Sequence, residues 1–456
     1  MTCVDFLLAR MAEHADALAV AAGDTTCTYR EILEETATWR ERVEKAGVPR
    51  GAVVSVEGDY GVGPIAAFLA LAERGAVIVP LSPDSAQHLD EFLQLGQVEF
   101  RLRAADSAEA QPTGRRAGHA CYDTLCQRRV PGLVLFTSGS TGRHKAAVHD
   151  LARLLRKFET RRHRRRTLVF LQLDHIGGVN TLLYTLSNGG AVVAPPDRSP
   201  ASVAACIERY AVELLPTSPT FLNLLLLSGE HERRDLSSLT LITYGTEAMP
   251  ESTLRKVATA FPRAKLQQTY GLTEVGILRS QSRGSDSLWV RVGGEGYETK
   301  VVDGRLWVRA ESAMLGYLNA PSPFDADGFL DTGDRVEVDG EWLRILGRES
   351  EIINVGGNKV YPAEVEDALL DLPGVRDAVV HAEPNPITGQ IVAATVVLDD
   401  RSEPVSAFKL RMRQGLKPRL PAWKIPAKVI LADGPLHSSR FKRMRGAASR
   451  EQERTR

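Results

Sequence analysis

A run of small residues directly after an apolar segment constrains this chain most. Val134-Leu135-Phe136 is a short apolar run of the kind that forms a buried strand. The six residues that follow it carry no large side chain; they are Thr137, Ser138, Gly139, Ser140, Thr141 and Gly142. Such a loop leaves backbone N–H groups unshielded, adds hydroxyl groups beside them, and has a nearby cation in Lys145. The pattern predicts a phosphate-binding loop at the end of a strand.

Two other interpretations of this loop must be compared with the first. Loops rich in Ser and Gly are mostly surface turns, but the buried strand before this one and the lysine after it favour phosphate binding. The P-loop of kinases and GTPases requires Gly-Lys-Ser/Thr at its end. Here Arg143 and His144 separate Gly142 from Lys145, and Ala146 follows. The P-loop interpretation is therefore excluded.

Composition excludes several classes of partner. Lys+Arg and Asp+Glu both number 57, so no net field attracts nucleic acid or a membrane surface. The segment 1–20 has the pattern of an amphipathic helix and not of a signal peptide, and no apolar run is long enough to span a bilayer. The 5 cysteines are odd in number and scattered, which is typical of free thiols in a reducing cytosol. We expect a cytoplasmic protein without nucleic-acid or membrane partners.

The first 130 residues alternate between helical and strand patterns. We predict a helix from Tyr29 toward Ala46, strands over 52–56 and 76–81, and a helix over 65–72. Further strands are expected at 167–171, 191–195 and 239–244, and an exposed connection at 104–118. Alternation of this kind predicts a parallel, doubly wound sheet and an α/β fold.

Six ordered motifs carry a resemblance that covers nearly the whole chain. They are the loop 137–145, a glycine turn at 245–247, YGLTE at 270–274, TGD at 332–334, Gly347-Arg348, and the segment 352–362. Together they resemble the adenylate-forming superfamily, which contains acyl- and aryl-CoA synthetases, adenylation domains of nonribosomal peptide synthetases, and firefly luciferase. His144 and Ala146 depart from the Pro and Gly that are usual in that family.

The resemblance implies a fold and two domains. The expected fold is α/β, with a large N-terminal domain of stacked α/β subdomains and a β-rich subdomain, plus a small mobile α+β C-terminal domain. The AMP-binding domain would cover residues 1–349 and the lid residues 350–456. Ser350 occupies the hinge position, where Asp or Lys is common in the family.

The resemblance also implies the residues that hold MgATP. The loop 137–142 and Lys145 would bind phosphates, and Thr273 would offer its hydroxyl to the α-phosphate. Glu274 would supply a hard oxygen ligand to the Mg²⁺ that accompanies ATP. Adenine and ribose would contact residues of the later motifs, namely Gly245, Thr246, Glu247, Tyr270, Gly271, Asp334 and Arg348. Tyr270 offers a flat face for stacking, and the Asp334 carboxylate can accept from both ribose hydroxyls.

A second set of residues is implied for the acid and the thiol. His175 would line the channel between the acyl pocket and the thiol entrance; a lone histidine is otherwise usually structural. Its neighbour Asp174 is the alternative, by comparison with domains that hold an amine. Gly356 and Gly357 would let a pantetheine arm pass close to the backbone, with Lys359 beside them. In the tail, Lys442 would neutralise charge between carboxylate and α-phosphate, although Phe441 stands where glycine is usual.

The reaction implied is carboxylate plus MgATP giving acyl-AMP and pyrophosphate, followed by transfer to a thiol. The acceptor is coenzyme A in one hypothesis, with Lys359 and the basic run Arg161–Arg166 as candidates for its phosphates. In the second hypothesis it is the phosphopantetheine of a carrier protein supplied in trans. The third is a degenerate homologue that binds nucleotide without turnover, against which the intact Thr273 and Glu274 argue. The apolar surroundings of His175 and Phe221 favour an aryl or alkyl acid.

Overall fold

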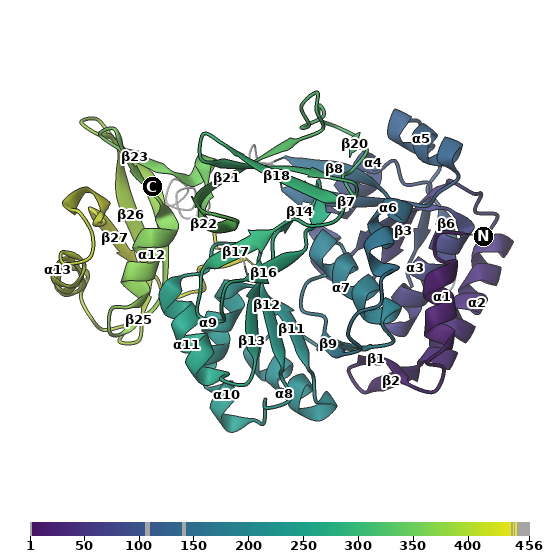
Figure 1. Ribbon diagram of the computed structural model, residues 1–456, viewed down its shortest axis with the longest axis horizontal. Helices are drawn as coiled ribbons and strands as arrows, with labels where there is room; N and C mark the ends of the chain where they lie inside the picture. The colour runs from purple at the N-terminus through teal and green to yellow at the C-terminus, as the bar shows by residue number, and fades with distance from the viewer. Residues whose placement is uncertain (1, 105–109, 139–142, 439–440, 442, 445–456) are drawn as a thin grey trace.

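The computed structural model describes residues 2–104, 110–138, 143–438, 441, 443 and 444. Figure 1 shows a broad body, coloured purple to green, and a small lobe at its left side, coloured light green to yellow. Among the described residues, the body contains three large sheets and a two-stranded one, and the lobe contains a fifth sheet. This arrangement confirms the predicted α/β fold with a large N-terminal part and a small C-terminal one. The boundary at residues 349 and 350 stays a prediction.

The first sheet carries the predicted phosphate loop. Its strand order is β20-β8-β7-β4-β3-β5-β6. The parallel middle consists of β3 (Val53–Glu57), β4 (Val77–Leu81), β5 (Phe100–Leu102) and β7 (Gly132–Ser138). The edges are antiparallel and consist of β6 (Ala110–Pro112), β8 (His144–Asp150) and β20 (Gly316–Tyr317). Each residue of β4 is buried, as a strand covered on both faces requires.

The second sheet carries the predicted adenine-binding turns. Its order is β13-β12-β11-β9-β10-β1-β2, and all strands except β2 run parallel. The strands are β1 (Leu18–Ala22), β2 (Thr25–Thr28), β9 (Arg166–Leu168), β10 (Ala191–Ala194), β11 (Leu214–Thr217), β12 (Leu241–Tyr244) and β13 (Lys265–Gln268). Strand β9 is shorter than the predicted 167–171, because the amide of Phe170 bonds to the carbonyl of Leu168 at 3.1 Å and turns the chain.

Helices cover both sheets, and some lie between them. Helix α3 (Val62–Arg74) is buried from Pro64 to Ala72, and its core cluster draws on strands of both sheets. Helix α2 (Tyr29–Lys45) begins with a capping box, in which Thr28 and Glu31 bond each other's backbone amides. The other helices of the body are α1 (Asp5–Ala12), α4 (Leu89–Leu95), α5 (Ala120–Arg128), α6 (Leu151–Leu155), α7 (Ile176–Ser187), α8 (Pro200–Tyr210), α9 (Pro219–Ser228), α10 (Glu230–Arg233) and α11 (Glu251–Ala260).

The third sheet is the predicted β-rich subdomain, and it is antiparallel. Its order is β16-β17-β22-β21-β19-β18. The strands are β16 (Ser280–Ser282), β17 (Trp289–Val292), β18 (Tyr297–Val302), β19 (Arg305–Ala310), β21 (Leu330–Asp339) and β22 (Trp342–Arg348). A short hairpin of β14 (Gly271–Leu272) and β15 (Gly276–Ile277) joins this sheet to the end of β13.

The lobe has a hydrophobic core of its own, built from residues between Ile353 and Val429. Its sheet contains β23 (Ile353–Val355), β24 (Asn358–Val360), β25 (Val375–Asn385), β26 (Gly389–Leu398) and β27 (Lys428–Leu431), with helices α12 (Pro362–Leu370) and α13 (Val405–Leu416). Helix α12 packs against α11 of the body, where Asp367 accepts from the amide of Ser252 at 2.8 Å and from its hydroxyl at 2.6 Å.

Two further observations concern the cysteines and the helices. All 5 cysteines are free thiols. In the part of the chain that the structure describes, no helix has both the length and the apolar character needed to cross a membrane.

Candidate active site

Two predicted motifs meet at the carboxyl ends of β12 and β13. The strands run parallel with Tyr244 opposite Gln268, so the turns that follow them lie side by side. Gly245 is required there, because a Cβ atom on it would lie 2.7 Å from the hydroxyl of Thr269 and 2.9 Å from its carbonyl oxygen. Thr246 adopts a φ of 73°, which is unusual for a β-branched residue. The backbone of this turn is therefore held in a strained form at the wall of a cleft.

That cleft has a volume of about 130 Å³ and contains residues from the body and the lobe. Its lining residues are Thr246, Glu247, Ala248, Gln268, Thr269, Tyr270, Gly271, Leu272, Asp334, Ile345, Leu346, Gly347, Arg348, Glu351, Tyr361, Pro362 and Ala363. The structure thus brings together predicted nucleotide-binding residues from four separate motifs. A cleft that closes between two parts of a molecule suits a ligand that both parts contact.

Asp334 is the most constrained charged group in the cleft. One of its carboxylate oxygens accepts from the hydroxyl of Tyr270 at 2.6 Å, and the other lies 3.4 Å from Nε of Arg348. Pairing of β21 with β22 places Asp334 directly opposite Arg348. Burial raises the pKa of Asp334, and the charge of Arg348 opposes that rise. Burial also raises the pKa of Tyr270 well above its usual value, so its phenol stays a donor. The Asp334 carboxylate is therefore a hydrogen-bond acceptor of fixed orientation.

Glu274 and Lys145 approach each other through Tyr317. The hydroxyl of Tyr317 donates to the carboxylate of Glu274, and Nζ of Lys145 lies 5.1 Å from the centroid of the Tyr317 ring. Tyr317 is on β20, which pairs with β8 and so reaches the strand that carries Lys145. Thr273 lies half-buried in the same turn as Glu274. No local sequence pattern reveals the contact between Tyr317 and Glu274, because the two residues are far apart in the sequence.

The predicted phosphate loop connects β7 to β8. Thr137 is half-buried at the end of β7 and pairs with Lys145, so the two strands bring the loop's ends together. The backbone of Ser138 completes strand β7. The predicted phosphate contacts of Gly139, Ser140, Thr141 and Gly142 fall on residues outside those that the structure describes.

The two candidates at the predicted acyl channel have different environments. Asp174 is buried, and one of its carboxylate oxygens accepts from the hydroxyls of Ser82 and Ser85, both at 2.7 Å. Its carboxylate therefore anchors the 3-10 helix η1 (Pro83–His88). His175 precedes helix α7, keeps 26% of its side chain exposed, and places Nε2 3.8 Å from Asp174. The structure favours His175 as the group available to a substrate.

A second cavity, of about 660 Å³, lies on the same edge of the second sheet as the cleft. It opens at the carboxyl ends of β1, β9 and β10. Its lining residues are Ala22, Gly23, Asp59, Tyr60, Pro83, Asp84, Val169, Gln172, Ala194, Pro195, Pro196, Asp197, Arg198, Ser199 and Phe441. Phe441 belongs to the tail, so the tail forms one wall of this cavity.

The tail lies across the edge of the second sheet. The carbonyl oxygen of Phe441 accepts from the hydroxyl of Ser218 at 3.0 Å. The Phe441 ring lies among three others, with centroid distances of 5.2 Å to Phe170, 5.5 Å to Phe221 and 5.1 Å to His437. Its φ is 52°, which favours glycine and explains the family's usual residue at this position. Lys442 lies outside the described residues, but its predecessor is held at the end of β11.

Arg443 connects the tail to both the body and the lobe. The amide of Arg443 donates to the carboxylate of Glu247 at 3.4 Å, and its Nη1 lies 2.7 Å from the carboxylate of Glu366 on α12. The Glu247 carboxylate also accepts from the amide of Thr220 at 2.8 Å. Glu247 therefore lines the cleft, but its carboxylate accepts hydrogen bonds from the start of α9 and from the tail.

Three predicted elements do not reach the cleft. Gly356 and Gly357 form the exposed turn between β23 and β24, with φ values of 58° and 90°. Lys359 is also exposed and places Nζ 3.7 Å from Glu349. None of these residues lines either cavity.

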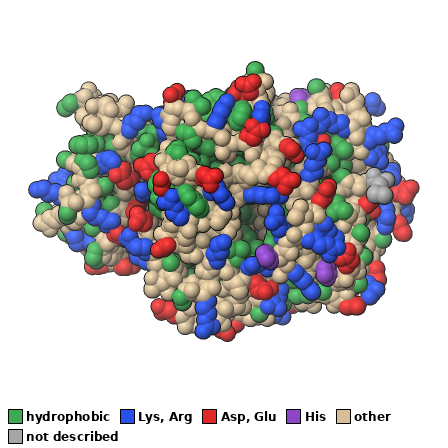
Figure 2. All heavy atoms as spheres, in the orientation of Figure 1, with side chains coloured by type: hydrophobic (Ala, Val, Ile, Leu, Met, Phe, Trp, Pro, Cys, Tyr) green, Lys and Arg blue, Asp and Glu red, His purple; other side chains and the backbone are tan. Residues whose placement is uncertain are grey.

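The basic run Arg161–Arg166 is the third element. It precedes β9 and so lies at the amino-end edge of the second sheet, opposite the cleft. Arg161 bonds to Glu13 at 2.6 Å and Arg166 to the carbonyl of Ala211 at 2.8 Å. The run is a surface segment whose described contacts are local. Figure 2 shows basic and acidic side chains interspersed over the viewed face, in line with the balanced composition.

Comparisons with known proteins agree with this geometry. The family model described as AMP-binding enzyme matches residues 7–318, and the model of the AMP-binding enzyme C-terminal domain matches residues 364–440. Indoleacetate–CoA ligase of Aromatoleum aromaticum is 27% identical over 464 residues, which cover 89% of this chain and 89% of that protein.

Solved structures share the fold. The anthranilate CoA ligase AuaEII in complex with anthranoyl-AMP superimposes with a TM-score of 0.81 at 21% identity, over 100% of this chain and 97% of that one. ATP-bound MatB from Rhodopseudomonas palustris gives a TM-score of 0.78 at 23% identity, over 99% of each chain. The two family models together span most of the chain; the first includes the cleft residues from Thr246 to Leu272, and the cleft residues from Asp334 to Ala363 lie between the two matches. The chain therefore belongs to the AMP-binding enzyme family and is an AMP-forming acid–thiol ligase, which uses ATP to activate a small carboxylic acid.

Proposed function

We propose that the protein converts an aryl or alkyl carboxylic acid to its coenzyme A thioester in two half-reactions. The observation that carries this proposal is the cleft in which Tyr270, Asp334 and Arg348 form one bonded unit, with Glu274 in the turn that follows the cleft residue Leu272. A buried acceptor for hydroxyl groups, a cation and a carboxylate able to bind a metal ion are the groups that a nucleoside triphosphate requires.

In the first half-reaction, Asp334 would accept from the ribose hydroxyls, and the Arg348 fork would contact ribose or phosphate. A carboxylate oxygen of the acid attacks the α-phosphorus, the bond from that phosphorus to the bridging oxygen breaks, and pyrophosphate leaves. Thr273 and Lys145 would donate to phosphate oxygens, and Lys442 would lie between the carboxylate and the α-phosphate. Preorganised donors of this kind stabilise charge that develops during transfer.

The metal ion that accompanies ATP fits Glu274. Its carboxylate is half-buried and already oriented by the hydroxyl of Tyr317, and carboxylate oxygens are the ligands that Mg²⁺ prefers. When bound, Mg²⁺ would neutralise charge on the departing pyrophosphate.

In the second half-reaction, the thiol sulfur attacks the acyl carbonyl, the acyl–phosphate bond breaks, AMP leaves, and the thiol proton passes to solvent or base. We infer that rotation about Ser350 exchanges Lys442 for the Gly356-Gly357 turn, a hinge closure of a common type. The thiol arm would enter through the cavity beside His175. Because Phe441 forms one wall of that cavity, withdrawal of the tail would widen it.

An aryl acid is the preferred substrate class. Phe170 and Phe221 lie 4.3 Å apart between ring centroids, beside the tail and at the carboxyl edge of the second sheet. The relative that acts on indoleacetate and the structure that holds anthranoyl-AMP support the same class. A panel of aryl, alkyl and amino acids in a pyrophosphate-exchange assay tests this choice. Exchange with amino acids alone would contradict it.

A carrier protein is the second candidate acceptor, and one observation favours it. The cavity lining includes three aspartates but a single basic residue, Arg198, which lies 2.5 Å from Asp59. Coenzyme A carries phosphates that require cations at the mouth of such a passage, whereas a carrier protein positions its own arm. In its present position Lys359 does not supply that charge.

The deciding experiment compares thioester yield from coenzyme A and from phosphopantetheine-loaded carrier proteins at equal thiol concentration. Thioester from coenzyme A supports the proposal, and acylation of a carrier without any coenzyme A thioester replaces it with the second candidate. Ala194→Trp, which fills the cavity, tests the thiol path. We expect it to slow thioester formation and to spare pyrophosphate exchange; a raised KM for the acid instead would show that the cavity holds the acid.

A further inference from the structure

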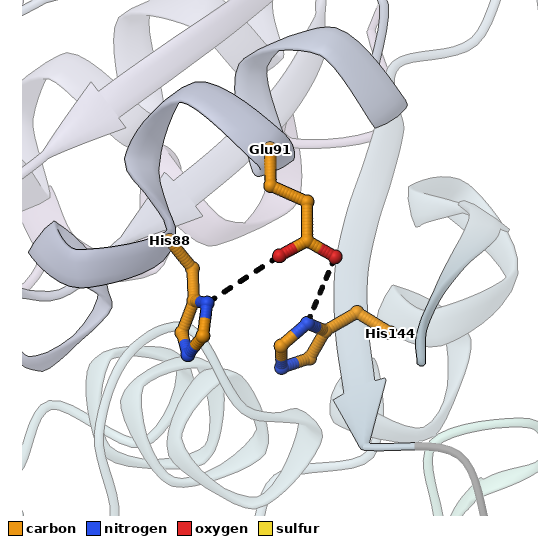
Figure 3. A group of neighbouring side chains, drawn as sticks. All are labelled: His88, Glu91 and His144. Atoms are coloured by element: carbon orange, nitrogen blue, oxygen red, sulfur yellow. Dashed lines mark hydrogen bonds and ion pairs between the residues drawn. The ribbon is translucent and has the colours of Figure 1, made fainter. Parts of the chain in front are cut away.

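Two histidines and a glutamate converge beside the strand that leaves the phosphate loop (Figure 3). Glu91 lies between them. Its two carboxylate oxygens lie 3.4 Å from Nδ1 of His88 and 3.1 Å from Nδ1 of His144. One potential ligand atom from each of the three residues lies within 4.8 Å of the others. Nothing in the proposed reaction uses this cluster.

We propose that His88, Glu91 and His144 bind a divalent transition-metal ion of the zinc type. Two imidazoles and one carboxylate are a common three-residue ligand set for zinc, with the fourth position left to water or another ligand. A tetrahedral ion with ligand bonds of about 2.0–2.2 Å separates its ligand atoms by about 3.4 Å. Each histidine Nδ1 lies near that spacing from Glu91, but from a different oxygen of its carboxylate, so side-chain rotations would bring one oxygen and both nitrogens onto one ion.

The backbone positions of the three ligands are fixed. His88 ends η1 and Glu91 lies in the first turn of α4, so the two side chains share one side of this junction. His144 opens β8, where Asn319 accepts from the amide of Ala146 at 3.1 Å and donates to the carbonyl of His144 at 2.8 Å. A metal site requires such support, because loosely held ligands cannot keep the geometry of the ion.

The rings are also oriented. Phe92 lies against both histidines, with centroid distances of 5.6 Å to His88 and 4.9 Å to His144, and it stacks on Phe136 at 4.1 Å. The ligand side chains remain open to solvent, with 39% of His88, 47% of Glu91 and 21% of His144 exposed. An ion can therefore enter without rearrangement of the fold.

The position of the proposed metal site beside Lys145 indicates its role. His144 directly precedes Lys145, the cation predicted for the phosphates, and successive residues of a strand point to opposite faces. An ion bound on the His144 face would fix the start of β8 to the η1–α4 junction without blocking the nucleotide face. We assign it a stabilising and positioning role and no part in the chemistry.

The test is a titration of the full chain, freed of metal by a chelator and of any histidine tag, with Co²⁺ in the absence of nucleotide. We expect one saturable equivalent with the visible ligand-field absorption of a low-symmetry site, displaced by Zn²⁺. Glu91→Gln and His144→Asn should each weaken the affinity by at least about tenfold. The matched control is His163→Asn, an exposed histidine outside the cluster, which should bind as the parent protein does.

Thermal unfolding checks that the variants fold and adds a second readout. Zn²⁺ should raise the Tm of the parent protein and of His163→Asn but not that of Glu91→Gln or His144→Asn. Absence of saturable Co²⁺ binding by the parent overturns the proposal. Binding that persists in both cluster variants also overturns it, because the ion would then lie elsewhere. In either case the cluster is a carboxylate bonded to two histidines.

Discussion

The nucleotide cleft and the β23–β24 turn of the lobe differ in how completely they are assembled. In the cleft, Asp334 is 7% exposed, and both of its carboxylate oxygens have partners from other strands or turns. In the turn, Gly356 and Gly357 are exposed and contact neither cavity. The ribose-binding groups proposed for acyl-AMP formation are thus in place, while the lobe turn proposed for thioester formation stands apart. We propose that one arrangement of the lobe serves one half-reaction.

The tail belongs with the cleft in this comparison. Phe441 bonds to Ser218 of the body, and Arg443 joins Glu247 of the body to Glu366 of the lobe. The residues on either side of Lys442 therefore bond to the body, whereas the turn at Gly356 is exposed. Variants that damage one half-reaction and spare the other are the means to sharpen this contrast.

The largest effect is expected from Glu274→Gln. The amide loses the charge that binds Mg²⁺, so pyrophosphate exchange should fall by at least about 100-fold at saturating MgATP. Thioester formation from supplied acyl-AMP should fall far less. Glu298→Gln, an exposed position on β18, serves as the control. Exchange within about threefold of the parent protein would remove Glu274 from the proposed site.

Lys442→Ala comes next. Loss of its charge should lower acyl-AMP formation by roughly 30-fold or more and leave thioester formation from supplied acyl-AMP nearly unchanged. The control is Lys424→Ala, whose Nζ bonds to Glu364 at 2.6 Å within the lobe. A larger adenylation defect in the control, or equal loss of both steps, would show that the tail does not deliver Lys442 to the cleft.

Gly357→Ala tests the other side of the contrast. A Cβ there meets no atom within 4 Å, so its cost is the strain of a φ of 90°. We expect about 1–2 kcal/mol, which slows thioester formation by roughly tenfold and leaves adenylation unchanged. Gly340→Ala, in an equally open turn with a φ of 61°, is matched to it and should affect neither step. Loss of adenylation in Gly357→Ala would break the comparison.

The smallest expected effect is a shift in the pH dependence of kcat/KM for ATP in the variant Tyr270→Phe. Burial raises the pKa of Asp334, so the ionised acceptor is lost as the pH falls through that raised value. The Tyr270 hydroxyl stabilises the ionised form, and its removal should raise the pKa of Asp334 further. The acid limb of kcat/KM for ATP should therefore move to higher pH. An unchanged limb would show that Asp334 protonation does not control ATP use.

The motif residues were the most predictable part of the site. Tyr270 follows β13, Asp334 lies within β21 and Arg348 ends β22, and each belongs to a short signature in the sequence. The partners of those residues were not predictable. Tyr317 reaches Glu274 only because β20 pairs with β8, a contact between strands that are distant in the sequence.

The fold shows the same division. Buried strands such as β4 follow from continuous apolar runs, and β9 is shorter than its apolar run because hydrogen bonding, not hydrophobicity, ends it. The sequence also gave no sign that Glu247 would bond to Thr220, or that His88 and Glu91 would meet His144. Each of these contacts depends on tertiary placement, which single-sequence patterns do not contain.

The aromatic contacts of Phe441 should affect how long the tail stays bound to the body. A glycine at this position would leave the body with little resistance, whereas withdrawal of the tail would separate Phe441 from Phe170 and Phe221 of the body. Two ring pairs worth about 1 kcal/mol each would lengthen the dwell of the tail by roughly 30-fold. We expect Phe441 to act as a delay that holds the acyl-adenylate sheltered until the lobe departs. Rapid-mixing traces of Phe441→Gly that show the parent's interval between the two half-reactions would rule out this delay.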